Sequence, residues 1–264
     1  MGVLNVTPDS FSDGGRFSTP DSALSQARRM IGEGAAIIDI GGESTRPGAA
    51  PATLEEELQR VVPVIAALRR ESAVFISVDT SKPEVMRAAV EAGADIINDV
   101  RALSEPGALA AAAASKAGIC LMHMKGEPRT MQEAPVYDDA VAEVHAYLQA
   151  RISRCLEAGV TPSRITIDPG FGFGKRVSHN LELLKNLQRF SDLEAPVLVG
   201  LSRKSMLAKI TGREVGERTA GSVALAAIAV LNGARIVRAH DVAATCDAIR
   251  VAAAVNQGEA FDVT

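Results

Sequence analysis

The chain has 264 residues, 47% of them hydrophobic, a size that matches one barrel domain better than two small domains. Its formal net charge of -4 argues against a general polyanion-binding surface, and so against a nucleic-acid partner, but it leaves room for a basic pocket inside a cleft. The longest uncharged apolar stretch, Val223 to Leu231, is too short to cross a bilayer, so we expect a soluble protein.

Eight short apolar runs of strand-forming residues occur along the chain, and stretches with helical spacing separate them. This alternation is typical of a parallel sheet, and eight such units predict an α/β fold, a (β/α)8 TIM barrel, as one domain over residues 1–264. In such a barrel the loops after the strands converge on one face and carry the active site. The runs cover residues 2–6, 36–48, 74–81, 94–100, 118–124, 165–175, 197–205 and 234–241.

The segments between the runs predict eight helices. We expect Gly93 and Gly159 to end the third and fifth of them, and Ser81 to cap the third. The helices are predicted over Asp21–Gly32, Leu54–Arg70, Lys82–Ala92, Leu109–Lys116, Tyr137–Ala158, Ser178–Phe190, Thr219–Asn232 and Val242–Asn256.

Two loops are rich in Gly, Pro and Ser: Thr7–Thr19 after the first strand and Glu43–Ala52 after the second. Long loops of this kind on a barrel are usually functional, and we expect both to be lids that stay mobile until ligand binds. Because the first strand begins almost at Met1, we expect the segment that would cover the N-terminal floor of the barrel to be absent.

The helix predicted over Thr219–Asn232 carries no charged residue, although an outer barrel helix should present a polar face to water. We expect a second subunit to cover it and the protein to be a homodimer. The alternative is a small, Ala-rich helix wedged between its neighbours.

The three cysteines, Cys120, Cys155 and Cys246, are far apart and form no C-x-x-C pair. This spacing argues against a disulfide framework and against a thiolate metal site. It predicts buried thiols in a reducing compartment, hence a cytoplasmic location.

Cationic side chains gather at the predicted strand ends. Strand periodicity puts Arg238 and His240 on the same side of the eighth strand, facing the barrel mouth. Arg46 in the second loop and Lys204 after the seventh strand bring further charge to this rim, which suits a phosphate or pyrophosphate. The alternative is that each cation pairs with a carboxylate of the rim.

Acidic and amide side chains oppose them: Asp39, Asp79, Asn98 and Asp168 each lie near the end of a strand run. Burying these groups is costly unless a partner satisfies them. A flat heterocycle with amino and ring N–H donors would do so through paired hydrogen bonds. A self-contained network of Asp, Asn and Lys is the competing interpretation, above all for Asp39.

Asn5 ends the first strand, and its amide oxygen suits Mg²⁺ that keeps most of its waters and shares phosphate oxygens. Without a phosphate ligand, Asn5 would be a turn residue. Gly170, Gly172 and Gly174 do not form the dinucleotide fingerprint, and we expect them to let a loop approach a ligand. Met122, His123 and Met124 fit packing better than a soft-metal site, and a zinc site is not expected.

These segments together resemble the dihydropteroate synthase family of folate biosynthesis, over Met1 to about Asn256. The resemblance is carried by eight motifs at the strand ends: NVTPDSFSDGG (5–15), GGESTRPGA (41–49), SVDTSKPEV (77–85), IINDV (96–100), LMHM (121–124), DPGFGFGK (168–175), GLSRKS (200–205) and RAHD (238–241).

The resemblance implies a transferase, of a family targeted by sulfonamides, that condenses 6-hydroxymethyl-7,8-dihydropterin pyrophosphate with p-aminobenzoate to give 7,8-dihydropteroate and pyrophosphate. It places the pterin on Asp79, Asn98, Met122, Asp168, Phe173 and Lys204. It places the pyrophosphate on Asn5 through Mg²⁺ and on Thr45, Arg46, Arg238 and His240. It places the p-aminobenzoate among Phe11, Thr45, Arg46, Pro47, Phe173, Lys204 and Ser205.

For such a reaction we expect a dissociative substitution at the pterin CH2, with Asp79, Lys204, Arg238 and His240 as the catalytic residues. No protein nucleophile is required, and we expect Ser202 to lack a partnered base. Three rival functions stay open: a pterin-binding methyltransferase that serves a corrinoid, a catalytically silent pterin-binding barrel, and a Schiff-base aldolase that uses Lys204.

Overall fold

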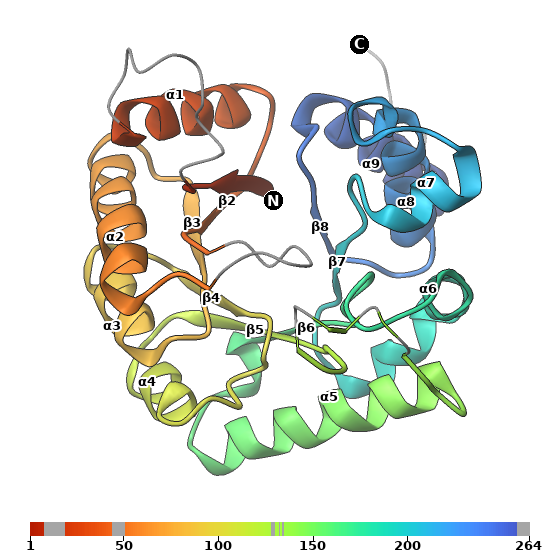
Figure 1. Ribbon diagram of the computed structural model, residues 1–264, viewed down its shortest axis with the longest axis horizontal. Helices are drawn as coiled ribbons and strands as arrows, with labels where there is room; N and C mark the ends of the chain where they lie inside the picture. Colours follow the sequence, from red (N-terminus) through yellow and green to blue (C-terminus); the bar gives the residue numbers. More distant parts are fainter. Residues whose placement is uncertain (8–18, 44–50, 128–129, 132, 134, 258–264) are drawn as a thin grey trace.

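The computed structural model describes residues 1–7, 19–43, 51–127, 130–131, 133 and 135–257. In this part of the chain eight parallel strands stand at the centre and the helices surround them (Figure 1). The strands are β1 (Gly2–Asn5), β2 (Ile37–Gly41), β3 (Phe75–Asp79), β4 (Ile96–Asp99), β5 (Gly118–Met122), β6 (Ile165–Asp168), β7 (Leu198–Gly200) and β8 (Ile236–Arg238).

The sheet closes on itself. Strands β1 to β6 pair in sequence order, and β7 pairs with β8. Two parallel bridges join these sheets, Ile167 to Val197 between β6 and β7, and Gly2 to Ala239 between β8 and β1. The predicted (β/α)8 barrel is thereby confirmed.

Every predicted strand and helix is found, with bounds that differ by a few residues. The helices are α1 (Thr19–Gly32), α2 (Leu54–Glu71), α3 (Pro83–Glu91), α4 (Ala108–Ala114), α5 (Ala140–Glu157), α6 (Val177–Lys185), α7 (Ser205–Thr211), α8 (Thr219–Leu231) and α9 (Val242–Gln257). The helix predicted to reach Phe190 ends at Lys185 and continues as a 3-10 turn, Leu187–Leu193. Helix α7 was not predicted, because its short sequence gives too little periodicity.

One predicted cap is wrong. Ser81 does not cap α3; its Oγ donates to Asp99 Oδ1 at 2.5 Å, and Lys82 is the N-cap residue, with Pro83 in the first turn. Gly93 and Gly159 do follow α3 and α5, with φ of +113° and +85°, the left-handed backbone that ends a helix.

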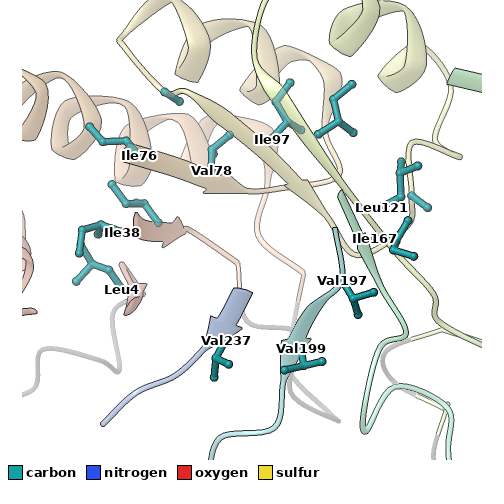
Figure 2. Packing of buried hydrophobic residues seen from close by; sticks show 14 of the residues in the cluster. Leu4, Ile38, Ile76, Val78, Ile97, Leu121, Ile167, Val197, Val199 and Val237 are labelled. Atoms are coloured by element: carbon teal, nitrogen blue, oxygen red, sulfur yellow. The ribbon is translucent and has the colours of Figure 1, made fainter. Parts of the chain in front are cut away.

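Alternate strand residues face the helices and form the core. Leu4, Ile38, Ile76, Ile97 and Val199 are at most 1% exposed and belong to one cluster with residues of the surrounding helices (Figure 2). A Cβ on Gly2 would lie 2.8 Å from Met30 Sδ of α1, so this residue also belongs to the outer face. The residues between them face the barrel interior, where polar side chains collect.

Helix α8 packs against α9 and α7, and it buries Ser222, Leu225, Ala226 and Ala229. Its opposite face is Ala220, Ala224, Ile228 and Leu231; the two larger side chains are 44% and 39% exposed. Within the described residues, therefore, neighbouring helices cover one face of α8 and leave an apolar face open.

No helix among the described residues combines the length and the apolar character that a membrane crossing requires. All three cysteines are free thiols, and Cys120 and Cys155 are buried.

Arg69 of α2 connects several segments at the N-terminal ends of the strands. Its Nε donates to Gly93 O at 3.1 Å, its Nη1 donates to Ser72 O at 3.3 Å and to Val74 O at 3.1 Å, and its Nη2 contacts Asp95. This face of a barrel serves stability, because the strand ends that carry chemistry lie on the other side.

Replacing Arg69 by Ala should lower the free energy of unfolding by about 2–3 kcal/mol, since three carbonyls and a carboxylate lose a charged donor. Arg70→Ala, at the exposed neighbouring position, is the matched control and should change it by less than about 0.5 kcal/mol. Urea unfolding of both variants measures the difference. Equal stabilities would show that the Arg69 contacts carry no weight.

Candidate active site

Polar side chains line the barrel interior at the carboxyl ends of the strands. The strand registers pair Gly41 with Asp79, Asp79 with Asn98, Met122 with Asp168, and Gly200 with Arg238. Paired residues of parallel strands share a face, so these side chains all point into the barrel interior near its mouth. The structure therefore directs Asp79, Asn98, Asp168 and Arg238 into the same interior, as the sequence analysis expected, whereas Arg46 lies outside the described residues.

Arg238 links two carboxylates across the barrel. Its Nε donates to Asp39 Oδ2 at 2.6 Å and its Nη2 donates to Asp79 Oδ2 at 2.8 Å. Asp39 is fully buried and also accepts from Asn98 Nδ2 at 3.3 Å. For Asp39 the interpretation as part of an internal network is confirmed, with Arg238 as the cation instead of a lysine. We call Arg238, Asp39 and Asp79 the carboxylate clamp.

Burial and charge act in opposite directions inside the clamp. Burial raises the pKa of Asp79 to about 7, although the neighbouring Arg238 guanidinium pulls it down. Burial also lowers the pKa of Arg238, but Asp39 and Asp79 outweigh this effect and raise it above its ordinary value. The clamp consequently holds a permanent cation beside a carboxyl group that gains or loses its proton near neutral pH.

Asp168 lies near the cation Lys204 in the same interior. We call Asp79, Asn98 and Asp168 together the acidic floor of the site. Asp168 Oδ1 accepts from Gly170 N at 2.7 Å, and burial raises the pKa of its carboxyl group. Burial and the nearby Arg238 lower the pKa of Lys204 to about 8. The Lys204 Nζ lies 4.1 Å from the centre of the Phe173 ring, a cation–π contact. Shifted pKa values that gather at one end of a barrel are typical of a functional site.

The loop after β6 passes very close to the end of β5. A Cβ on Gly170 would lie 1.8 Å from His123 O, and one on Gly174 would lie 2.1 Å from Lys125 O. Both glycines have positive φ, 71° and 61°. Side chains at these positions would push the loop away, so the glycines allow it to place Phe173 beside Lys204. That this loop approaches a ligand stays a prediction.

The buried side chain of Lys175 holds this loop through hydrogen bonds to its backbone. Only 3% of Lys175 is exposed, and its Nζ lies 2.8 Å from His123 Nδ1 and donates to the carbonyls of Gly170 at 2.9 Å and Phe173 at 3.1 Å. Burial lowers the pKa of Lys175 to about 7. Burial, together with Lys175, lowers the pKa of His123 to about 2, so this imidazole is neutral and accepts. His123 therefore packs and accepts a hydrogen bond, in line with its interpretation as a packing residue.

His240 faces the turn after β7. Its Nδ1 lies 3.1 Å from Ser202 Oγ, and its backbone N donates to the same oxygen at 3.2 Å. The prediction that Ser202 lacks a partnered base is wrong, because β7 and β8 are neighbours and their ends bring the two side chains together. Burial, with Arg238 next, lowers the pKa of His240 to about 4.

Three of the remaining predicted site residues lie among the described residues, and four do not. Asn5 ends β1 on the inner face, Met122 is buried at the end of β5, and Ser205 is the exposed first residue of α7. Phe11, Thr45, Arg46 and Pro47 lie outside the described residues, as do most residues of both predicted lids.

Sequence reasoning gave no role to Lys175 and did not foresee the contact between Ser202 and His240. Lys175 closes the DPGFGFGK motif, but nothing in the spacing shows that its side chain turns back under the loop. The Ser202–His240 contact had a usable signal, since the two residues follow adjacent strands two positions after Gly200 and Arg238, which share a register.

Among the described residues no group of three or more His, Cys, Asp or Glu side chains is arranged to hold a metal ion. Asn5 supplies one amide oxygen at the mouth, a ligand type that Mg²⁺ accepts when phosphate oxygens and water complete its shell. The residues present therefore fit a magnesium ion that is shared with a phosphorylated ligand.

Comparison with known proteins decides the family. The family model described as pterin binding enzyme matches residues 1–240. Dihydropteroate synthase of Escherichia coli strain K12 is 56% identical over 251 residues, which cover 95% of this chain and 89% of that protein. The chain belongs to the dihydropteroate synthase family of pterin-binding enzymes.

Solved structures of this family share its barrel. A Yersinia pestis dihydropteroate synthase with a sulfonamide drug complex superposes with a TM-score of 0.93 at 50% identity, over 97% of this chain and 94% of that one. A Xanthomonas albilineans dihydropteroate synthase with 4-aminobenzoic acid gives 0.92 at 54% identity, over 97% and 92%. Another structure of the Xanthomonas albilineans enzyme contains 7,8-dihydropteroate and gives 0.89 at 51%, over 97% and 92%.

The close approach at Gly170 can be tested against a glycine in open space. Gly170 and Gly212 have the same φ of 71°, but a Cβ on Gly212 would meet nothing within 4 Å. Gly212→Ala should cost about 1–2 kcal/mol of unfolding free energy from backbone strain alone. Gly170→Ala should cost clearly more and displace the β6 loop, measured by thermal unfolding. Equal costs would show that the contact with His123 O relaxes freely.

Proposed function

We propose that this chain is a dihydropteroate synthase that condenses 6-hydroxymethyl-7,8-dihydropterin pyrophosphate with p-aminobenzoate and releases pyrophosphate. The observation that carries the proposal is that Asp79, Asn98 and Asp168 line the same interior as the cations Lys204 and Arg238. The family relatives bound to 4-aminobenzoic acid and to 7,8-dihydropteroate support the same assignment.

The acidic floor fits the pterin ring. Asp168 and Asp79 present carboxylate oxygens to the ring N–H and amino donors, and Asn98 adds an amide group beside them. Burial strengthens these hydrogen bonds, because little water competes for the same atoms. Phe173 and Met122 supply apolar contact at the edge of the floor.

The cations fit the diphosphate. Arg238 has five N–H donors, and the clamp engages only Nε and one hydrogen of Nη2. The guanidinium can therefore keep both carboxylates and still offer Nη1 to a phosphate oxygen. This resolves the apparent conflict between the clamp and the pyrophosphate role assigned to Arg238, because one guanidinium serves both halves of the substrate.

We propose that the bond from the pterin CH2 to the leaving oxygen breaks before the new bond to nitrogen is complete. Positive charge then develops on the pterin, where Asp79 stabilises it, and negative charge develops on the leaving oxygens, where Arg238 and His240 donate. The neutral arylamine attacks the carbon without a protein nucleophile, held by Phe173, Lys204 and Ser205 and by Phe11, Thr45, Arg46 and Pro47.

We propose that Asn5 contributes to a magnesium site on the diphosphate. When bound, the ion neutralises charge on the leaving oxygens and orients them. Asn5 would hold water of its hydration shell at the mouth, on the strand next to β8 and its cationic residues.

We also propose a homodimer. Its interface would cover Ala220, Ala224, Ile228 and Leu231 of α8, an apolar face that water otherwise contacts. Val251 and Val255 of the neighbouring helix α9 are also exposed apolar residues, 65% and 70% exposed. A cytoplasmic location is proposed on the free thiols, which suit a reducing compartment.

The central experiment is a coupled assay for dihydropteroate and pyrophosphate with both substrates. Product should form in the presence of magnesium, and its formation should stop when a chelator removes the ion. The Asn5→Ala variant should require a higher magnesium concentration to reach half of its maximal rate. Methyl transfer to a corrinoid, or borohydride trapping of a substrate on Lys204, would instead favour a rival function. Binding of the pterin without turnover would favour the silent barrel.

Asp168 tests the pterin floor. Asp168→Ala should abolish binding of the pterin pyrophosphate while the fold persists, because this side chain adds little to the core. Asp168→Asn keeps an acceptor for Gly170 N but places a donor where the ring donors should lie, so it should also fail to bind in calorimetry. Tight binding by either variant would contradict the pocket. Asp247→Asn, on an 80% exposed side chain, is the control.

The parent protein and the Asp168→Asn variant also allow a test of stability against pH. Because the native pKa of Asp168 is raised, the native state holds its proton more tightly than the unfolded state, so parent stability falls as pH rises above the ordinary value of 3.8. The amide has no such titration. The stability of Asp168→Asn relative to the parent should therefore be greater at about pH 8 than at about pH 4.

A further inference from the structure

Ser202 and His240 make two contacts through a single oxygen atom. The backbone N–H of His240 donates to Ser202 Oγ at 3.2 Å, and the Nδ1 of the same residue lies 3.1 Å from that oxygen. Both residues are partly buried, at the ends of β7 and β8. The first contact has only one possible sense, because a backbone N–H cannot accept.

The hydrogen atoms of this pair can be counted. A serine hydroxyl donates one hydrogen and accepts up to two. Since Ser202 Oγ already accepts from the His240 backbone, its own hydrogen is available for Nδ1, which is the acceptor that the hydroxyl contacts among the described residues. If the hydroxyl donates to Nδ1, it donates once and accepts once, and Nδ1 carries no hydrogen.

The imidazole is the neutral form at neutral pH. Burial and then Arg238, Arg203 and Lys204 lower the pKa of His240 to about 4, and Asp241 opposes this only in part. A neutral imidazole has one N–H. If Nδ1 accepts from Ser202, that hydrogen is on Nε2, on the far side of the ring from Ser202.

The turn that carries Ser202 is held in an uncommon shape. Arg203 has φ of 57°, a left-handed backbone that is rare for a residue with a long side chain. Its backbone N donates to Ser222 Oγ at 2.9 Å, its carbonyl accepts from Arg218 Nη1 at 3.1 Å, and its guanidinium donates to Asp241 at 2.5 and 3.0 Å. These contacts fix the turn relative to α8 and to the segment after β8, and so fix Ser202 relative to His240.

We propose that Ser202 is a positioning residue that selects the Nε2–H tautomer of His240, so that a neutral imidazole presents a donor to the leaving pyrophosphate. The inference rests on the proposed function for the identity of that anion. The tautomer itself is a property of the protein without substrate. Ser202 acts through His240 and takes no part in bond formation.

The tautomer is measured directly by long-range ¹H–¹⁵N correlation of the histidine rings, since a protonated and an unprotonated ring nitrogen differ strongly in shift. The chain has four histidines, and His240→Ala identifies the signal of His240. The parent protein should show hydrogen on Nε2, and Ser202→Ala should show both tautomers. An Nδ1–H form in the parent, or no change in Ser202→Ala, would overturn the proposal.

A double-mutant cycle tests whether Ser202 works through His240. Ser202→Ala should lower kcat/KM for the pterin pyrophosphate about tenfold, the effect of one hydrogen bond near 1.4 kcal/mol. In the His240→Ala background the same substitution should have almost no further effect, because the tautomer no longer matters. An undiminished loss in that background would mean that Ser202 has another role.

Ser222→Ala is the matched control, because it removes a hydroxyl that holds the same turn without touching His240. It should leave the tautomer unchanged. A tautomer change equal to that of Ser202→Ala would assign the effect to the shape of the turn and contradict the proposal. If the parent protein lacks synthase activity but shows the Nε2–H form, the proposed function fails while the tautomer assignment stands.

Discussion

The carboxylate clamp of Arg238, Asp39 and Asp79 is the constraint on which the site depends. Two carboxyl groups lie inside the barrel, and their burial would be prohibitive without a fixed cation. Arg238 comes from the last strand, whereas Asp39 and Asp79 come from the second and third, so the clamp joins distant parts of the chain across the interior. Short parallel bridges close the barrel at β6–β7 and β8–β1, and the contact of Arg238 with Asp39 adds a polar link between β8 and β2.

A buried ion pair is weak ground for stability, because the cost of desolvation can match the attraction. The clamp matters here because Arg238 influences the protonation states of the neighbouring groups. Asp79 has a pKa near 7, Lys204 near 8, and His240 stays neutral, all at the carboxyl ends of the strands. A neutral imidazole and a poised carboxyl group next to a permanent cation form a site in which charge can separate on a ligand without large rearrangement.

Sequence patterns predicted the barrel, its strands and most helices, because strand and helix periodicities alternate without interruption. They also predicted which polar residues share the mouth, since parallel strands end on one face. They did not predict which partner each residue takes. Arg238 could have faced an anion alone, yet it engages Asp39, a choice set by strand register and tilt. Likewise, Lys175 turns under its loop because Gly170 and Gly174 bring the β6 loop against β5, a three-dimensional contact without a periodic signal.

The most direct test of the account is a crystal structure of the protein with 6-hydroxymethyl-7,8-dihydropterin pyrophosphate. The account predicts the ring on Asp79, Asn98 and Asp168 and the diphosphate within hydrogen-bond distance of Arg238 and His240, with Arg238 still holding Asp39. A ring bound elsewhere, or a diphosphate directed away from β8, would contradict it.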